Sequence, residues 1–339
     1  MQAKRTILTI SIVFMLLLGT AACDRNQFPD TVVLTSDMPG YLAMQHIVFL
    51  NDYLYGRTPF TYREKESAEW LVDTLLDMGY TEADIYVQEF HRDDVGIWMG
   101  IPAWEMRDII DALSGDFQTR DYSQNIILTI PGQSEQIIVV GAHYDTLPYP
   151  GASDNASGTA LLLESAYRMR YVEHYYTFVY IFFGAEEMGL LGARYYMDTR
   201  KDVEVDNILF MVNVDVLFEG PHLLYVVGSG ADAAWITDAW DRIACDLDAQ
   251  HDELEFTSFP GGLHMGSDHI IFYREGIPVI WFMGLARRMT GNFYARVLHS
   301  TRDCVHYIGA RWPGKMERAL WGYSLFLEAV LLYDYHDET

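Results

Sequence analysis

Five residues of types that commonly ligate metal ions follow one another along the chain, each within or just after a short apolar run. They are His143, Asp154, Glu187, Asp215 and His299. Two imidazoles and three carboxylates, one of them shared, can hold a pair of zinc ions that activate one water molecule between them. The set therefore predicts a di-zinc hydrolase with two Zn²⁺ ions per chain as its cofactor.

The charges of this set agree with that chemistry. Two Zn²⁺ ions bring four positive charges and three carboxylates return three, so a bridging hydroxide would cancel the one that remains. Zinc lowers the pKa of a bound water from about 15.7 towards roughly 7, so the site should favour a deprotonated water near neutral pH. We expect that hydroxide to attack a substrate group polarised by zinc.

The first candidate ligand follows a predicted strand. Residues 137–140 are continuously apolar and lead directly to His143, with Asp145 two positions further on. Side chains two apart on an extended chain point the same way, so Asp145 can accept the second imidazole N–H and hold the metal-binding tautomer. In isolation, this pair is more typical of an ordinary surface histidine.

The second candidate, Asp154, lies among small residues in the segment 151–160, which leads into an apolar helix. A carboxylate at this place can cap the helix by accepting hydrogen bonds from its free N–H groups. It can instead bridge two cations a few ångströms apart, and small neighbours would then let the backbone come close to the metals. Both interpretations are open at this point.

Acidic residues also follow two further apolar runs. Glu186 and Glu187 come after residues 178–183. Because adjacent side chains diverge, Glu187 can face a metal while Glu186 faces the water; a solvated helix start is the alternative. Asp215 follows the run 208–214, where an unpaired buried charge would be costly, so it either binds metal or pairs with an arginine.

The last part of the chain supplies the second imidazole. His299 is followed by Asp303, a possible hydrogen-bond partner. Asp268 either lines the substrate cleft or caps a short helix over residues 270–274. Eight of the eleven histidines, all except His143, His269 and His299, have no predicted role.

The apolar pattern predicts the elements that must bring these residues together. Short apolar runs typical of strands buried on both faces cover residues 126–130, 137–140, 178–183, 208–214, 223–227 and 279–282. Helical patterning covers residues 64–78, 156–170, 189–199, 231–247 and 316–333. This alternation predicts the α/β class: a three-layer sandwich with a mostly parallel central sheet flanked by helices, and ligands in loops at the carboxyl ends of its strands.

The beginning of the chain has the features of an export signal, residues 1–22. Lys4 and Arg5 precede an apolar run that is short for a membrane span and ends in small residues. Cys23 follows in the context of a bacterial lipoprotein cleavage site, except that Thr20 stands where leucine is usual. We expect Cys23 to be lipidated; the alternative is ordinary signal cleavage nearby, which would release a soluble protein.

The rest of the chain is predicted to form one catalytic domain. Residues 23–42 are polar, contain two prolines and are expected to be a tether, and residues 43–339 are long enough for one large α/β domain. Residues 93–121 have no clear periodicity and are expected to be an insertion. The protein is therefore predicted outside the cytoplasm, as a periplasmic or cell-surface lipoprotein or else secreted, with membrane contact only through the lipid anchor.

The net charge is strongly negative. Removal of the predicted signal takes away Lys4 and Arg5, which leaves 21 basic and 48 acidic side chains. Nucleic acid is an unsuitable partner because its phosphates would be repelled. The charge is expected to keep an exposed protein soluble; a field that steers cationic substrates or metal ions is the alternative. Cys245 and Cys304 could pair in an oxidising compartment or remain two free buried thiols.

Taken together, these segments resemble the di-zinc aminopeptidase family of metallopeptidase clan MH, which includes bacterial leucyl aminopeptidases and has glutamate carboxypeptidase and glutaminyl cyclase as relatives. The resemblance extends over about residues 45–335. Besides the segments above, it includes Ser123-Gln124-Asn125-Ile126, Gly266-Ser267-Asp268-His269 and Gly276-Ile277-Pro278. The family commonly has Asp where Ser153 stands and Thr where Cys304 stands, and neither difference removes a ligand.

The resemblance implies a zinc exopeptidase of phosphorylase/hydrolase-like architecture with defined residue roles. One zinc would be held by His143 and Asp215, the other by Glu187 and His299, with Asp154 shared. Glu186 would be the general base, and a free substrate α-amine would bind the second zinc, which would restrict cleavage to the N-terminal residue.

The sequence therefore predicts an aminopeptidase that acts on peptides with a free N-terminus. One alternative is a glutaminyl cyclase-like acyltransferase, which shares much of the scaffold with one zinc. The other is a receptor or binding protein that keeps the fold and has lost catalysis, although none of the five ligands is missing here.

Overall fold

The computed structural model describes residues 32–92, 94, 118–200, 205–229, 233–259, 266–287 and 293–336. The predicted signal, Cys23 and most of the predicted insertion 93–121 lie outside the described residues. Among those that are described, no helix combines the length and apolar character needed to cross a membrane.

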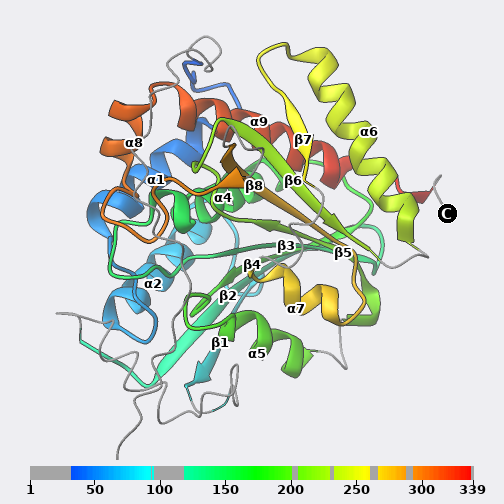
Figure 1. Ribbon diagram of the computed structural model, residues 1–339. Coiled ribbons are helices and arrows are strands. Elements are labelled where there is room, and N and C mark those ends of the chain that lie inside the picture. Colours follow the sequence, from blue (N-terminus) through cyan, green and yellow to red (C-terminus); the bar gives the residue numbers. More distant parts are fainter. Residues whose placement is uncertain are drawn as a thin grey trace, which may run out of the picture.

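A mixed sheet forms the centre of the molecule (Figure 1). Its strands are β1 (Ile85–His91), β2 (Tyr122–Ile130), β3 (Ile137–His143), β4 (Thr177–Phe183), β5 (Ile208–Val214), β6 (His222–Gly228), β7 (Phe256–Ser258), β8 (Val279–Arg287) and β9 (Phe293–Tyr294). They are ordered β1-β2-β4-β3-β5-β8-β6-β7, and β9 pairs with β8. The central strands β4, β3, β5 and β8 run parallel to one another.

Antiparallel pairs flank this parallel centre. Strand β2 is antiparallel to β1 and β4, and β6 is antiparallel to β8. The reason lies in the connections. Residues 131–136 join β2 to β3 and residues 215–221 join β5 to β6, and both links are shorter than the dozen or so residues that a parallel crossover needs.

Helices cover both faces of the sheet. One layer contains α1 (Tyr41–Tyr53), α2 (Tyr62–Asp77), α4 (Ser157–Met169), α6 (Ala234–Gln250), α8 (Val305–Arg311) and α9 (Lys315–Leu332). The other contains α5 (Leu191–Arg200) and α7 (His269–Arg274). Alternate residues of the central strands point into two separate apolar clusters, so the predicted three-layer α/β fold is confirmed.

The first helix is tied to the centre of the domain. Helix α1 begins at Tyr41, inside the segment predicted as a tether. The buried carboxylate of Glu164 in α4 accepts hydrogen bonds from the backbone N–H groups of Gly40 (2.5 Å) and Ala43 (2.7 Å). A carboxylate from another helix thereby satisfies N–H groups that have no partner at a helix start.

Candidate metal centre

The five predicted ligands lie together at one end of the sheet. His143 is the last residue of β3, Asp215 follows β5, and Glu187 follows β4 after a short turn. These three strands are parallel neighbours, so their carboxyl ends meet at one edge. Asp154 lies in the turn Ala152–Ala156 before α4, and His299 lies in the loop between β9 and α8.

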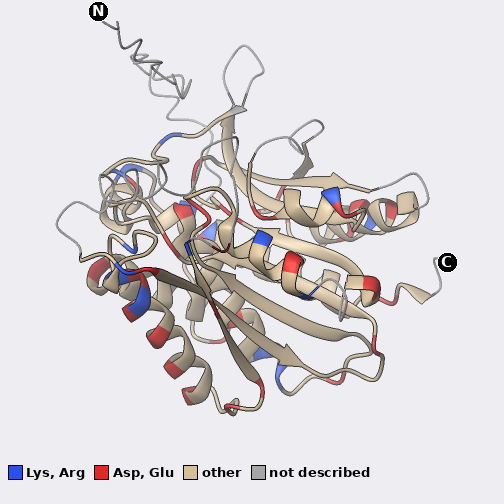
Figure 2. Ribbon diagram, turned by 90° about the horizontal axis from the view of Figure 1, so that it is seen from below, with Lys and Arg blue, Asp and Glu red and all other residues tan. Residues whose placement is uncertain are grey.

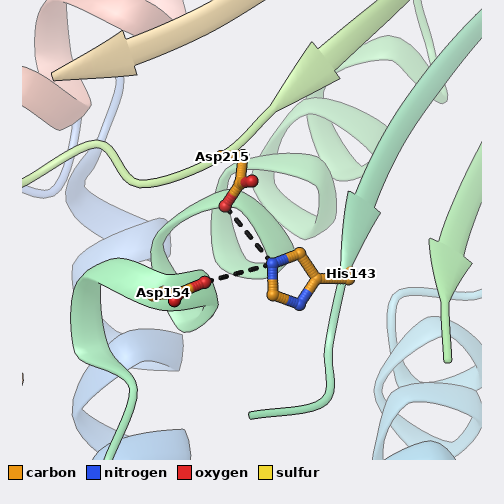
Figure 3. A group of neighbouring side chains, drawn as sticks. All are labelled: His143, Asp154 and Asp215. Carbon is orange, nitrogen blue, oxygen red and sulfur yellow. Dashed lines mark ion pairs between the residues drawn. The ribbon is translucent and has the colours of Figure 1, made fainter. Parts of the chain in front are cut away.

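Two groups of three side chains share Asp154. In the first, Nε2 of His143 lies 3.2 Å from Oδ1 of Asp154 and 3.3 Å from Oδ1 of Asp215 (Figure 3). In the second, Nε2 of His299 lies 3.1 Å from Oδ2 of Asp154 and 3.2 Å from Oε2 of Glu187. Each oxygen of the Asp154 carboxylate therefore faces a different imidazole.

These distances suit zinc. Two ligand atoms about 2.0–2.1 Å from a tetrahedral zinc ion lie about 3.3 Å apart. An imidazole nitrogen carries at most one hydrogen, so neither Nε2 can donate a full hydrogen bond to both of its carboxylates at once. A cation at the centre of each group would contact all three ligand atoms, and imidazole and carboxylate are ligands that zinc accepts.

Asp145 connects the first imidazole to the neighbouring acidic turn. Nδ1 of His143 lies 3.1 Å from the backbone oxygen of Asp145 and 3.6 Å from its carboxylate, so the carbonyl is the closer partner. The carboxylate instead accepts hydrogen bonds from the backbone N–H groups of Glu186 (3.0 Å) and Glu187 (3.1 Å). Asp145 therefore positions the turn that carries both glutamates as well as His143.

The turn that carries Asp154 is held by Asp303. The carboxylate of Asp303 accepts hydrogen bonds from the backbone N–H groups of Ser153 (2.6 Å) and Asp154 (3.0 Å). The side chain of Asp154 does not cap α4, whose N-cap is Ala156. Of the two interpretations of Asp154, the geometry favours the one in which its carboxylate faces cations.

Small residues bring this turn against the end of β5. A Cβ atom on Gly158 would lie 2.2 Å from the carbonyl oxygen of Val214, so only glycine fits. The hydroxyls of Ser153 and Ser157 accept hydrogen bonds from the N–H groups of Phe218 (3.0 Å) and Leu217 (3.2 Å). Asp154 and Asp215 are thereby fixed relative to each other.

Separate hydrogen bonds position Asp215 and the segment before His299. The hydroxyl of Ser267 donates to Oδ2 of Asp215 (2.8 Å), which leaves Oδ1 facing His143. The buried carboxylate of Glu219 accepts hydrogen bonds from the N–H groups of Arg296 and Val297 (2.8 Å for Val297), just before His299.

The backbone is strained at three places in the site: next to Glu186, next to Asp215, and at His299 itself. Ala185 (φ 54°), Val216 (φ 54°) and His299 (φ 52°) adopt the left-handed conformation that non-glycine residues rarely adopt. Such conformations cost about 1–3 kcal/mol each and are found mainly at functional sites, where the surrounding structure enforces them.

The site is strongly coupled electrostatically. Burial opposes protonation of His143, but the charges of Glu186 and Asp215 raise its pKa well above the usual value. Burial likewise opposes protonation of His299, yet Asp154 and Glu187 raise its pKa to about 11. Burial and the charge of Asp154 raise the pKa of Glu187 to about 7. Without metal, protons on the imidazoles therefore take the place of cations among the carboxylates.

Asp268 lies beside this cluster. Its side chain is fully buried, neither carboxylate oxygen has a hydrogen-bond partner among the described residues, and α7 receives no side-chain cap from it. Burial is the main cause that raises its pKa well above the usual value, and the charges of Asp215 and Asp145 add to it. The capping role considered from the sequence is therefore absent.

The two cysteines that the structure describes do not pair. Cys245 and Cys304 are both free thiols, but Cys245 is exposed and Cys304 only partly buried, so the expectation of two buried thiols is wrong. Sγ of Cys304 accepts a hydrogen bond from the N–H of Tyr307 (3.4 Å), so it takes the place of a hydroxyl at the start of α8.

Several supporting residues could not be found from the sequence. The sequence predicts Asp303 as a partner of His299, but its carboxylate accepts hydrogen bonds from N–H groups of the Asp154 turn. Glu219 acts through backbone N–H groups and Ser267 across loops, and no spacing in the sequence signals such contacts.

The comparisons with known proteins agree with this geometry. The model of Peptidase family M28 matches residues 125–324, which include all five ligand candidates. Aminopeptidase YwaD of Bacillus subtilis is 35% identical over 47% of this chain, and the probable lipoprotein aminopeptidase LpqL of Mycobacterium tuberculosis is 37% identical over 28%. The matched segments span only 35% and 20% of those two proteins.

Solved structures share the fold. BSAP, a zinc aminopeptidase from Bacillus subtilis, superposes with a TM-score of 0.64 at 18% identity over 87% of this chain and 95% of its own. A glutaminyl cyclase from Bacteroides thetaiotaomicron superposes with a TM-score of 0.61 at 18% identity over 88% and 98%. Because the family model covers more than half of the chain and contains the whole candidate centre, this chain belongs to Peptidase family M28.

Proposed function

We propose that this protein is an exported zinc aminopeptidase, which hydrolyses the peptide bond after the first residue of peptides with a free N-terminus. The observation that carries the proposal is the carboxylate of Asp154, whose two oxygens lie 3.2 and 3.1 Å from the imidazoles of His143 and His299. This arrangement suits two metal ions with a shared ligand. Membership of a peptidase family and the aminopeptidase relatives support the choice of substrate.

The proposed zinc ligands follow from the two groups. His143, Asp154 and Asp215 would hold one ion, and Asp154, Glu187 and His299 would hold the other. When bound, zinc supplies Lewis acidity and a water that ionises near neutral pH.

Glu186 is the proposed general base. Its Oε2 lies 4.0 Å from Nε2 of His143, and its side chain is 12% exposed, so it borders both the metal centre and the solvent side. Burial raises the pKa of Glu186 well above its usual value, with contributions from Asp268 and Glu187. A carboxylate of raised pKa at this place can take a proton from the attacking water and return it to the leaving amine nitrogen.

Asp268 is proposed as a further residue on the substrate side. Its buried carboxylate accepts no hydrogen bond from the part of the chain that the structure describes, and its charge acts on Glu186. We expect Asp268 to contact the substrate or to influence the protonation of Glu186 during turnover.

Adjacent glutamates allow a matched test. Glu186→Gln should keep about two zinc ions per chain and lower kcat by about 100- to 10,000-fold, because only the proton acceptor is lost. Glu187→Gln should lose zinc, because a ligand is weakened. Metal analysis and hydrolysis of amino-acid p-nitroanilides measure both, with N-blocked substrates as controls.

Two results would contradict the proposal. Unchanged turnover of Glu186→Gln would exclude Glu186 as the base. Equal cleavage of free and N-blocked substrates would exclude an aminopeptidase.

Glutaminyl cyclase-like activity is the alternative enzyme, and the shared fold favours it as a second candidate. Peptides that begin with glutamine distinguish the two, because a cyclase releases ammonia and an aminopeptidase releases glutamine. One zinc per chain would support the cyclase. A protein that folds without binding zinc and has no activity would instead support a binding role.

We place this activity outside the cytoplasm. The supports are the predicted signal at residues 1–22, the context of Cys23, and the likeness to LpqL, which is described as a probable lipoprotein. If Cys23 is lipidated, Cys23→Ser should move the protein from the membrane fraction to the soluble fraction, and an unchanged distribution would contradict the anchor.

A further inference from the structure

Arg57 has a fully buried guanidinium group, and its hydrogen bonds to the described residues all go to backbone carbonyls. Nε donates to the oxygen of Tyr144 (2.6 Å), Nη2 to that of Gly151 (3.2 Å) and Nη1 to that of Pro150 (3.2 Å). Nη1 also reaches the oxygens of Leu50 (3.4 Å) and Leu54 (3.2 Å).

These carbonyls come from three separate pieces of the chain. Tyr144 lies between His143 and Asp145. Pro150 and Gly151 lead into the turn of Asp154. The other two belong to the C-terminal end of α1, where the helix dipole favours a cation, although the oxygen of Leu50 also accepts the N–H of Leu54 (3.2 Å). One side chain therefore joins the loop of the first imidazole, the loop of the shared carboxylate and the end of a helix.

The backbone around Arg57 strengthens the same connection. The oxygen of Arg57 accepts a hydrogen bond from the N–H of Thr146 (3.1 Å), and the N–H of Gly56 donates to the oxygen of Tyr149 (3.1 Å). We call these contacts of Gly56 and Arg57 with residues 144–151 the Arg57 clamp.

The charge of Arg57 also suits this place. Within the part of the chain that the structure describes, no carboxylate forms an ion pair with it, and it lies instead in the field of the site's acids. Burial lowers the pKa of Arg57 to about 10, while Asp145, Asp303 and Asp154 act in the opposite direction. The guanidinium therefore remains charged at neutral pH and offsets part of the negative charge of the centre.

We infer that Arg57 is a positioning residue for the metal centre. It sets the separation between His143, at the end of β3, and Asp154, in the turn before α4, which are two of the three ligands of one proposed zinc ion. The inference rests on the proposed function, because it concerns zinc binding. Supporting residues of this kind typically change metal affinity by about 10- to 100-fold.

The test compares two buried arginines. Arg57→Lys keeps a positive charge, but a compact ammonium cannot reach carbonyls on three sides. Arg318 provides the control, because it is buried and donates to the carbonyls of Glu253 (2.7 Å) and Pro221 (2.7 Å) while touching no proposed ligand. Zinc affinity is measured by competition with a chelator, and unfolding temperature and kcat at saturating zinc are measured beside it.

We expect Arg57→Lys to bind zinc about 10- to 100-fold more weakly than the wild type, and Arg318→Lys to bind it as the wild type does even if both lose stability. Equal zinc affinity in wild type and Arg57→Lys would overturn the inference and leave the proposed function standing. A wild type that binds no zinc would overturn both.

A measurement on the wild type covers the case in which Arg57→Lys does not fold. If the Arg57 clamp strengthens zinc binding, then bound zinc must stabilise the Arg57 clamp by the same free energy, because coupling is reciprocal. We expect zinc to slow hydrogen exchange at the N–H groups of Gly56 and Thr146 by at least tenfold, and to leave the N–H of Phe256, near Arg318, unchanged. Equal exchange with and without zinc at the clamp would overturn the inference.

Discussion

The carboxylate of Asp154 faces two imidazoles, and the chemistry of the site depends on what lies between them. In the protein without metal, the raised pKa values of His143 and His299 mean that protons occupy these places. Metal ligation needs neutral imidazole, so zinc and protons compete for the same nitrogen atoms.

This competition gives a prediction for pH dependence. The pKa of His299 is raised to about 11, so its imidazole is protonated throughout the neutral range and must lose that proton when zinc binds. Apparent zinc affinity should therefore rise with pH, by about tenfold per pH unit for this proton alone. Competition titrations between pH 6 and 8, corrected for protonation of the chelator, measure the slope. An affinity independent of pH would show that the imidazoles are already neutral without metal.

At the scale of elements, the site depends on close approach between the turn before α4 and the end of β5. A Cβ on Gly158 would meet the backbone oxygen of Val214, which cannot move without moving Asp215. Gly158→Ala should therefore destabilise the fold by about 1–3 kcal/mol and weaken zinc binding. Gly309→Ala is the control, because its Cβ would meet only the flexible end of Met316 at 3.4 Å. Denaturant unfolding of both variants measures the difference, and equal stability would contradict the proposed close approach.

The elements that the sequence predicted are those with strong apolar patterns. The runs at 178–183 and 208–214 correspond to β4 and β5, and the helix predicted at 156–170 corresponds to α4 (Ser157–Met169). The strands that the sequence did not predict have weak apolar patterns: β1 is half exposed, β7 has three residues and β9 has two. Propensity and periodicity carry too little signal over such short or exposed segments.

That the candidate ligands would lie together could be predicted for the same reason. Three of them stand at or just beyond the ends of buried strands, where an acid or a histidine is unexpected without a role. Their supports could not be predicted in detail, because Asp145, Asp303 and Arg57 act mainly on backbone groups that only folding brings near. The sequence shows which side chains exist, but it does not show which loops lie in contact in the folded protein.

At the scale of the whole molecule, Asp and Glu residues occur on many of the described helices and loops as well as at the candidate metal centre (Figure 2). This arrangement of the described acidic residues favours the interpretation that the acidic excess keeps an exposed protein soluble. The parallel centre of the sheet brings the candidate ligands together at one edge, and the two helical layers bury its apolar side chains.

The central claim is that two zinc ions share Asp154. Anomalous diffraction from crystals of the zinc-loaded protein, recorded on both sides of the zinc absorption edge, tests it most directly. We expect two peaks, one among His143, Asp154 and Asp215 and the other among Asp154, Glu187 and His299. A single peak at this place, or zinc bound only elsewhere on the molecule, would contradict it.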